Sequence, residues 1–278
     1  MKVVLFCGGQ GLRIRGYSES IPKPMVPIGY RPILWHVMRY YAHFGHCDFV
    51  LCLGYGADVI KKYFLEYSEA ESNDFVLEDG GRRIELLGSD ISNWRITFIH
   101  TGTRSPVGER LRRVGHLLQD EDIFLANYGD VLTDAPLPEL VERFARSGKM
   151  AAFVAVRPRA YTFHLVDVGE DELIRDVTDV STADLWINGG YFLFRKAILD
   201  ELAPDEDLVP DVLPRLIRRN EVLGFKYDGF WAPMDTLRDR DHLEAMVDAG
   251  TTPWAMSHPN GTAAASDCVG SDEAVGTS

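Results

Sequence analysis

The sequence lacks the features of several large classes of protein. Its 278 residues include four cysteines, none of which forms a Cys-x-x-Cys pair or lies near histidines at zinc-ligand spacing. No apolar run approaches the ~20 residues that a membrane-spanning helix needs. Met1 and Lys2 lead directly into a strand-like segment, without a basic and then apolar leader, so we expect a cytoplasmic protein. Small zinc-binding, membrane-spanning and secreted disulfide-rich proteins are therefore disfavoured.

Positive charge is also scarce. The formal net charge is −13, from 42 acidic and 29 basic residues. Nucleic acids and anionic membranes would be repelled by such a surface, so we expect neither as a partner. A nucleotide is not excluded, because a few local cations and a metal ion can hold a triphosphate even in an acidic protein. The hydrophobic fraction of 46% is that of an ordinary globular protein.

Short apolar strands alternate with amphipathic helices along the first half of the chain. The pattern predicts strands at 3–7, 48–53, 94–100, 123–128 and 150–156, and helices at 32–44, 57–67, 109–118 and 137–147. Residues 68–93 are polar and poorly periodic, with Gly80-Gly81 as a turn, and are expected to be an insertion outside the core.

After Pro158 the pattern changes. Strand-like pieces follow one another closely at 162–168, 172–177 and 186–194, before helices at 195–202 and 208–219, a strand at 222–227 and a helix at 236–249. We therefore expect an α/β fold of Rossmann-like type, with a mixed, mostly parallel central sheet flanked by helices. The Gly-, Thr-, Ala- and Ser-rich residues 255–278 are expected to form a disordered tail.

Glycines and two cations follow the first predicted strand. Gly8, Gly9 and Gly11 let the backbone approach a phosphate and offer it amide donors, and Arg13 and Lys23 add positive charge nearby. The spacing is neither the dinucleotide fingerprint nor a P-loop. Tight turns also use glycine, and both cations could lie on the surface. Their position beyond a strand end of an α/β sheet favours contact with phosphate.

Two acidic residues occupy comparable positions later in the chain. Asp130 follows the strand 123–128 through Gly129, and Asp235 precedes the last predicted helix. Asp235 could simply cap that helix, and Asp130 could simply make a turn. Two carboxylates that converge on phosphates would instead supply the hard oxygen ligands that Mg²⁺ prefers. Taken together, they favour a magnesium site.

These segments resemble the sugar-1-phosphate nucleotidyltransferases, and most closely the glucose-1-phosphate cytidylyltransferases, across roughly residues 1–254. The matching blocks occur in the family's order, and they are Gly8-Gly9-x-Gly11-x-Arg13, Pro22-Lys23-Pro24-Met25, Pro32-Ile33-Leu34-Trp35-His36, Tyr128-Gly129-Asp130, Ile187-Asn188-Gly189-Gly190 and Gly229-Phe230-Trp231-x-Pro233-Met234-Asp235-Thr236. The resemblance implies the nucleotidyltransferase fold, which is GT-A-like, in a single domain over 1–254. Its nucleotide-binding part would cover about 1–135 and its sugar-phosphate-binding part about 136–254.

The resemblance also implies an activity. The phosphate of a sugar 1-phosphate would attack the α-phosphorus of a nucleoside triphosphate in line and release pyrophosphate. It favours CTP as the nucleotide, glucose 1-phosphate or a related sugar or cyclitol phosphate as the acceptor, and a homo-oligomeric enzyme for which the insertion at 68–93 is a candidate interface.

The family's site residues carry over to matching positions. Arg13 and Lys23 would be catalytic, and Asp130 and Asp235 would hold Mg²⁺. The nucleotide-binding residues would be Gly8, Gly9, Gly11, Arg110 and Asp130, and the substrate-binding residues Asn188, Gly189 and His164. Tryptophans and tyrosines near these blocks, Trp231 among them, are expected to belong to the core.

The chain departs from the family where the acceptor should bind. Asp179 stands in place of the lysine that binds the sugar phosphate, Phe163 in place of a glycine that lets the sugar approach, and Glu109 in place of a second glycine. One explanation is an unusual acceptor, with Arg157, Arg159, His164 or Arg175 supplying the missing charge. The alternative is a non-catalytic nucleotide-binding relative. Retention of Arg13, Lys23, Asp130 and Asp235 favours activity.

Overall fold

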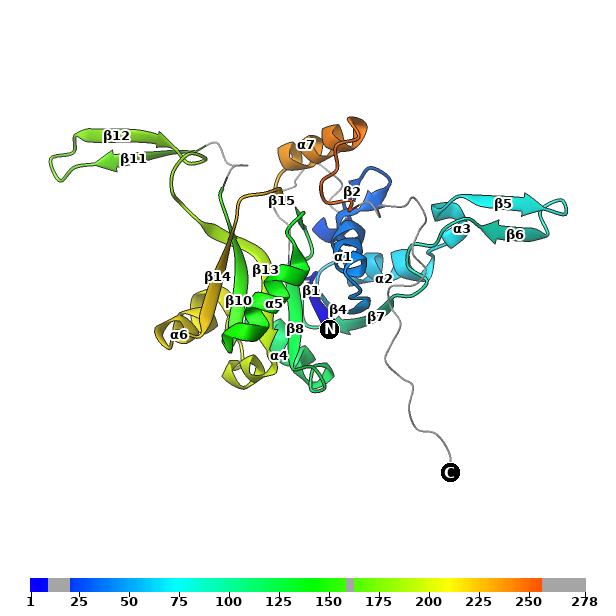
Figure 1. Cartoon of the computed structure of the whole chain (residues 1–278), viewed down its shortest axis with the longest axis horizontal. Helices are drawn as coiled ribbons and strands as arrows, with labels where there is room; N and C mark the ends of the chain where they lie inside the picture. Colours follow the sequence, from blue (N-terminus) through cyan, green and yellow to red (C-terminus); the bar gives the residue numbers. More distant parts are fainter. Residues whose placement is uncertain (10–20, 159–162, 257–278) are drawn as a thin grey trace, which may run out of the picture.

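The computed structural model describes residues 1–9, 21–158 and 163–256. Its centre is a seven-stranded sheet in the order β14–β10–β13–β8–β1–β4–β7 (Figure 1). The strands are β1 (Lys2–Phe6), β4 (Asp48–Leu53), β7 (Arg95–His100), β8 (Ile123–Tyr128), β10 (Ala151–Val156), β13 (Ile187–Arg195) and β14 (Val222–Tyr227). Strand β13 runs antiparallel to β8 and β10, and the other pairings of this sheet are parallel. The predicted mixed, mostly parallel sheet is confirmed.

The order of the strands creates a switch point. From β1 the chain moves outward to β4 and β7, then returns to place β8 on the other side of β1. Ligands of open α/β sheets bind beyond the carboxyl ends of the strands at such a point. The loops after β1 and β8 are therefore placed to form a binding site.

Helices cover both faces of the sheet. The helices are α1 (Ile33–His43), α2 (Ala57–Leu65), α3 (Glu69–Ser72), α4 (Val107–Val114), α5 (Leu137–Ser147), α6 (Leu213–Arg218) and α7 (Leu237–Asp248). Side chains alternate between the faces of a strand. In β1, Val3 and Leu5 pack into a core with α1 and α5, whereas Val4 and Phe6 pack into a second core with α4 and α6. We call these the α1/α5 face and the α4/α6 face.

Short segments complete the fold. Two small ladders pair β2 (Pro27–Ile28) with β3 (Arg31–Pro32) and β9 (Val131–Thr133) with β15 (Trp231–Pro233). The 3-10 segments are η1 (Lys23–Met25), η2 (Gly115–Leu117) and η3 (Lys196–Glu201), and η4 (Leu208–Val212) is π-helical. No helix among the described residues is long and apolar enough to cross a membrane.

Two of the predicted helices take a different form. The segment expected to be helical at 195–202 is the 3-10 segment η3, and the helix expected at 208–219 is divided into η4 and α6. Pro210 and Pro214 lie within the second segment and cannot donate backbone hydrogen bonds. A continuous α-helix would lose bonds at both positions, which accounts for the irregular first turns.

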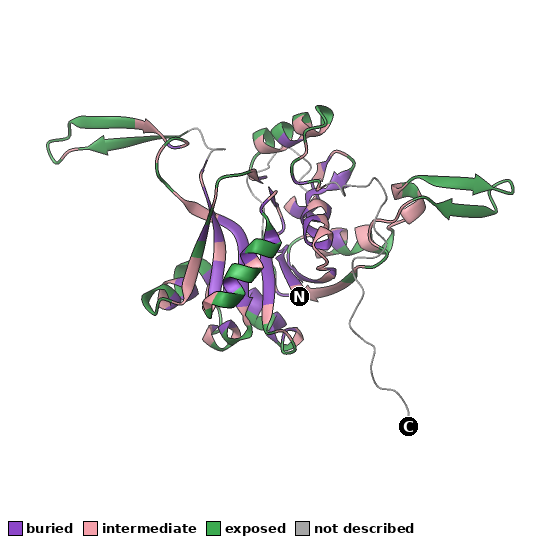
Figure 2. Ribbon diagram, viewed as in Figure 1, coloured by how far each residue is buried: buried purple, intermediate pink, exposed green. Residues whose placement is uncertain are grey.

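Two β-hairpins project from opposite ends of the molecule (Figure 1). One consists of β5 (Phe75–Glu78) and β6 (Arg83–Leu86), and the other of β11 (His164–Val168) and β12 (Ile174–Asp179). Both are coloured as exposed over most of their length in Figure 2. The first lies in the predicted insertion, and the turn at Gly80 and Gly81 is confirmed by their φ angles of +67° and +93°. The sequence did not predict that this insertion contains α3 and two strands.

Candidate active site

A cleft of about 530 Å³ lies at the carboxyl ends of β1 and β8, at the switch point. Its floor is made of strand ends, one wall comes from η1 and β15, and the other comes from the start of α4 and the loop before η4. The lining residues are Phe6, Cys7, Gly8, Gly9, Lys23, Pro24, Ser105, Pro106, Val107, Arg110, Tyr128, Asp130, Val131, Ile187, Asn188, Gly189, Asp207, Trp231, Pro233 and Asp235. Most of the predicted site residues therefore lie around one cavity.

Lys23 lies between two carboxylates. Its Nζ is 2.6 Å from Oδ2 of Asp130 and 2.5 Å from Oδ1 of Asp235, which lies 212 residues away in the chain. Pairing of β9 with β15 brings the two aspartates together, since it sets Val131 opposite Pro233, and the Met234 amide donates to the Asp130 carbonyl at 3.0 Å. The sequence predicted that these three residues converge, but not that the ammonium bridges the carboxylates.

Opposing effects act on Lys23. Burial alone would lower its pKa, but the charge of Asp130 and the hydrogen bonds that Lys23 donates to both aspartates raise the pKa above its usual value. Lys23 is therefore a permanent cation at neutral pH. It balances two carboxylates that would otherwise repel each other.

The two carboxylates also fit a magnesium ion. A single cationic nitrogen already reaches both of them at hydrogen-bonding distance, so a metal ion could touch both. Within the described ranges there is no group of three or more His, Cys, Asp or Glu side chains that could hold a metal ion. A magnesium ion here would take its remaining ligands from phosphate and water, as it commonly does in phosphate-handling sites.

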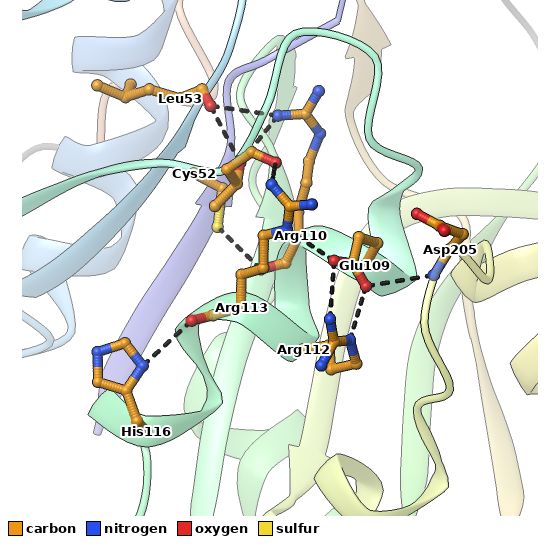
Figure 3. A network of polar contacts seen from close by, with 9 residues as sticks. Cys52, Leu53, Glu109, Arg110, Arg112, Arg113, His116 and Asp205 are labelled. Carbon is orange, nitrogen blue, oxygen red and sulfur yellow. Dashed lines mark hydrogen bonds and ion pairs between the residues drawn. The ribbon is translucent and has the colours of Figure 1, made fainter.

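Arg110 fixes the end of the cleft that adjoins the loop after β1. It is 4% exposed, and its guanidinium donates to the Gly8 carbonyl at 2.9 Å and to the Thr101 hydroxyl at 2.9 Å. It also donates to the Leu53 carbonyl at 3.4 Å (Figure 3). These acceptors lie just beyond or at the ends of β1, β7 and β4. A Cβ atom on Gly8 would lie 1.9 Å from Arg110 Nη1, so a larger residue there would displace the guanidinium from these bonds. Arg110 therefore shapes the loop after β1 and places positive charge beside it.

Glu109, the neighbour of Arg110 in α4, accepts a separate set of hydrogen bonds. Its buried carboxylate accepts hydrogen bonds from Arg112 at 2.6 Å and Arg113 at 2.6 Å, and from the Asp205 amide at 3.3 Å (Figure 3). Hydrogen bonding from Arg112 is the main cause that lowers the pKa of Glu109 to about 2. The Glu109 amide donates to the Glu206 carbonyl at 3.0 Å. This departure from the family pattern thus ties α4 to the loop that carries Asp207 into the cleft.

The other end of the cleft is formed by the start of β13. Asn188 accepts a hydrogen bond from the Gly190 amide at 2.9 Å, and the Gly189 carbonyl accepts one from the Trp231 indole at 2.8 Å. Gly190 has a φ of +79°, and a Cβ atom there would lie 2.6 Å from the Tyr128 ring. Trp231 is half-buried and lines the cleft, so it does more than fill the core. The sequence signal for this role is that Trp231 belongs to the same family-like block as Asp235.

The structure gathers eight of the predicted site residues around the cleft, namely Gly8, Gly9, Lys23, Arg110, Asp130, Asn188, Gly189 and Asp235. Gly11 and Arg13 lie outside the described residues, as do Arg159 and the tail from 257. His164 is not brought to the cleft, because it begins the exposed strand β11, opposite Asp179 in β12. Phe163 is 66% exposed at the base of the same hairpin.

Comparison with known proteins identifies the chemistry. Residues 2–248 match the family described as "Nucleotidyl transferase". The chain is 34% identical to the glucose-1-phosphate cytidylyltransferase of Salmonella typhimurium over 256 residues, which cover 91% of this chain and 98% of that protein. It is 32% identical to the "Probable glucose-1-phosphate cytidylyltransferase" of Bacillus subtilis, over 92% of this chain and 100% of the relative.

A solved structure shares the fold. HddC from Yersinia pseudotuberculosis superposes with a TM-score of 0.63 at 20% identity, covering 88% of this chain and 99% of HddC. The family match extends over both ends of the cleft and over the Lys23, Asp130 and Asp235 cluster. The chain therefore belongs to the nucleotidyl transferase family and is an enzyme of the nucleotidyltransferase class.

Proposed function

We propose that this enzyme transfers CMP from CTP to glucose 1-phosphate, or to a related sugar or cyclitol phosphate, and releases pyrophosphate. The observation that carries the proposal is the position of Lys23, between Asp130 and Asp235 and beside the glycine loop after β1. The names of the curated relatives support CTP and glucose 1-phosphate as substrates. We infer that the reaction takes place in the cytoplasm.

The nucleotide would lie over the glycine end of the cleft. Gly8 and Gly9 would offer backbone amides to it, and Arg110 would add a fixed positive charge beneath that loop. Asp130 and Asp235 would hold Mg²⁺, which supplies charge neutralisation for the phosphates and the departing pyrophosphate. Lys23 would move from the carboxylates towards the transferred phosphate, where its charge stabilises the pentavalent arrangement.

The acceptor would enter beside β13. Asn188 and the backbone at Gly189, which Trp231 fixes in place, would contact sugar hydroxyls. The attacking phosphate oxygen is already an anion at neutral pH, so the reaction needs no general base. Catalysis would then rest on placing the acceptor in line with the α-phosphorus and on neutralising charge.

We further propose that the enzyme is a homo-oligomer. Both hairpins expose large apolar side chains, including Leu77 at 58%, Ile84 at 51%, Ile174 at 58% and Val177 at 56%. Exposed apolar surface of this kind commonly marks a contact with another protein. Light scattering after size-exclusion chromatography would give the mass in solution, and the mass of one chain would contradict the proposal.

The activity is tested by pyrophosphate release in the presence of Mg²⁺. CTP, UTP, dTTP, ATP and GTP are each paired with a panel of sugar 1-phosphates. We expect release with CTP and glucose 1-phosphate or a relative, and loss of release in Lys23→Ala and Asp235→Ala. Silence across the panel while CTP still binds would favour the alternative of a non-catalytic relative.

A further inference from the structure

The part of the chain that the structure describes provides no free cation at the proposed acceptor end of the cleft. Among the described residues that line the cleft, the positive side chains are Lys23 and Arg110. Lys23 is bound to two carboxylates, and Arg110 is bound to backbone and hydroxyl oxygens at the opposite end. Asp179, which stands where the family has a lysine, binds Ser181 through its carboxylate on the outlying hairpin. Any positive charge for a distal part of the acceptor must therefore come from elsewhere.

Two cations lie farther along the same edge of the sheet, and both contact one aromatic ring. The guanidinium of Arg157 lies 4.8 Å from the centre of the Trp186 ring, and the ammonium of Lys226 also lies 4.8 Å from that centre. Arg157 directly follows β10, Trp186 directly precedes β13, and Lys226 lies near the end of β14. Trp186 is the neighbour of Ile187, which lines the cleft.

The strand register places this cluster beside the acceptor end. Ala155 of β10 is opposite Asn188 on one side and Lys226 on the other, so Lys226 and Asn188 share one row across the sheet. Val156, Ile187 and Phe225 pack towards the α1/α5 face. Because side chains alternate along a strand, Asn188 and Lys226 are directed to the α4/α6 face, and the contacts of Lys226 and Arg157 with the Trp186 ring place the whole cluster beside Lys226. The cluster and Asn188 thus lie on the same side of the sheet.

The existing partners of Arg157 are mostly exposed and hold it loosely. Its guanidinium donates to the Ala183 carbonyl at 3.0 Å and to Asp184 at 3.3 Å, and its Nε is 3.5 Å from Asp228. The Trp186 indole donates to Asp184 at 3.1 Å. The side chains of Asp184 and Asp228 are 80% and 57% exposed, and ion pairs of this kind contribute little.

Lys226 has fewer recorded partners than Arg157. Within the described part of the chain, no carboxylate forms an ion pair with Lys226, whose recorded contact is with the Trp186 ring. A phosphate or carboxylate group on a ligand could therefore take hydrogen bonds from both cations and displace the exposed aspartates. The exposed pairs that such a group would replace are long, at 3.3 Å to Asp184 and 3.5 Å to Asp228, and contribute little.

We propose that Arg157 and Lys226, both of which contact the Trp186 ring, bind an anionic group at the end of the sugar acceptor that is remote from its reacting phosphate. This rests on the proposed function, because it takes the acceptor to lie along Asn188 and Gly189. The group is a phosphate or a carboxylate. The preferred acceptor is then a sugar 1-phosphate with a second negative charge.

The test compares three acceptors at saturating CTP: glucose 1-phosphate, glucose 1,6-bisphosphate and glucuronic acid 1-phosphate. For the wild type, we expect kcat/KM to be roughly 10- to 100-fold higher with one of the charged acceptors than with glucose 1-phosphate, the size of one or two charge-assisted hydrogen bonds. The two charged acceptors distinguish a phosphate site from a carboxylate site. Equal values for all three acceptors would overturn the proposal.

Two variants test whether Arg157 and Lys226 cause the preference for a charged acceptor. Arg157→Met and Lys226→Met keep the apolar stems on Trp186 and remove the charge, so each should reduce the preference while the KM for CTP and the rate with glucose 1-phosphate stay near wild type. Arg175→Met is the matched control, because Arg175 is exposed on the β11–β12 hairpin. Arg157 also contacts the segment after that hairpin, and Lys226→Met tests the site without disturbing this contact. A preference that survives both variants would contradict the proposal.

The anion site can also be tested if the proposed transfer reaction is not observed. If no acceptor yields pyrophosphate, calorimetric titration of glucose 1-phosphate and the two charged sugars into the wild type still tests the subsite. Tighter binding of a charged sugar, lost in Lys226→Met, would support the site without transfer. Equal binding of the three sugars, or binding of none, would overturn it.

Discussion

The two ends of the cleft are built differently. At the end proposed for the nucleotide, the 4% exposed guanidinium of Arg110 binds groups at the ends of three adjacent strands, and a Cβ atom on Gly8 would collide with that guanidinium. At the acceptor end, β13 continues from a hairpin whose residues are mostly exposed (Figure 2). In the proposed function, the groups that would hold phosphate and metal are thus fixed by the central sheet. The part that would distinguish acceptors is attached to an extension that can vary without affecting the core.

The largest effect on activity is expected at Asp235, where the two ends of the cleft meet. Asp235→Asn removes one carboxylate charge from the pair that Lys23 bridges. We expect kcat to fall by about 10²- to 10³-fold, because a fixed charge near the reacting phosphates is lost. Asp241→Asn in α7 is the matched control, since its side chain is 71% exposed. Equal rates for wild type and Asp235→Asn in a pyrophosphate-release assay would show that Asp235 does not take part in the reaction.

Glycine substitutions test how rigid the nucleotide end is. Gly8→Ala would force a methyl group to within 1.9 Å of Arg110, whereas a Cβ atom on Gly9 meets nothing within 4 Å. We expect Gly8→Ala to lower the free energy of unfolding by about 1–3 kcal/mol through overpacking, and Gly9→Ala to change it much less. Urea denaturation of the two variants measures the difference. A similar loss in both would show that Arg110 does not define this loop.

Much of this arrangement could be predicted from the sequence. The buried strands were recognisable because continuous apolar runs such as Asp48–Leu53 report burial on both faces. Lys23, Asp130 and Asp235 could be assigned to one site because each follows or precedes a recognisable element. The hairpin β5–β6 could not, because its residues are exposed on both faces and carry no apolar period. The contacts of Glu109 with the Asp205 amide and the Glu206 carbonyl could not be predicted either, because they depend on α4 meeting a loop almost a hundred residues away.

Acidification should distinguish the Glu109 network from the rest of the fold. The pKa of Glu109 is lowered from 4.5 to about 2, so its contribution to stability is fully present above about pH 4.5 and is lost as the pH falls towards 2. Glu109→Gln should therefore cost about 2 kcal/mol at pH 7, from weakened hydrogen bonds to charged groups.

The difference between wild type and Glu109→Gln should shrink between pH 4.5 and pH 2. Denaturation at pH 7, 5, 4 and 3 follows this difference. Other groups that titrate in acid affect both proteins alike and cancel in the comparison. A difference that stays constant down to pH 3 would mean that Glu109 gains little from its arginines.

The smallest effect on the isolated chain is expected at the acceptor-side hairpin. Val166 and Val177 face each other across β11 and β12 and are 49% and 56% exposed. Replacing both by serine should change the stability of one chain by roughly 0.5 kcal/mol or less, as for most surface positions. If this hairpin contacts another copy, the mass in solution should fall. An unchanged mass would place the interface elsewhere.

Nucleotide binding tests the central claim most directly, because the claim is that the nucleotide and metal end of the cleft is intact. In a calorimetric titration with Mg²⁺, we expect CTP to bind the wild type, and to bind much more weakly in Lys23→Met or when the metal is chelated. Lys62→Met, whose side chain is 71% exposed on α2, serves as the control. If neither CTP nor any of the other four nucleotides binds in the presence of Mg²⁺, the assignment of this cleft as a nucleotidyltransferase site is contradicted.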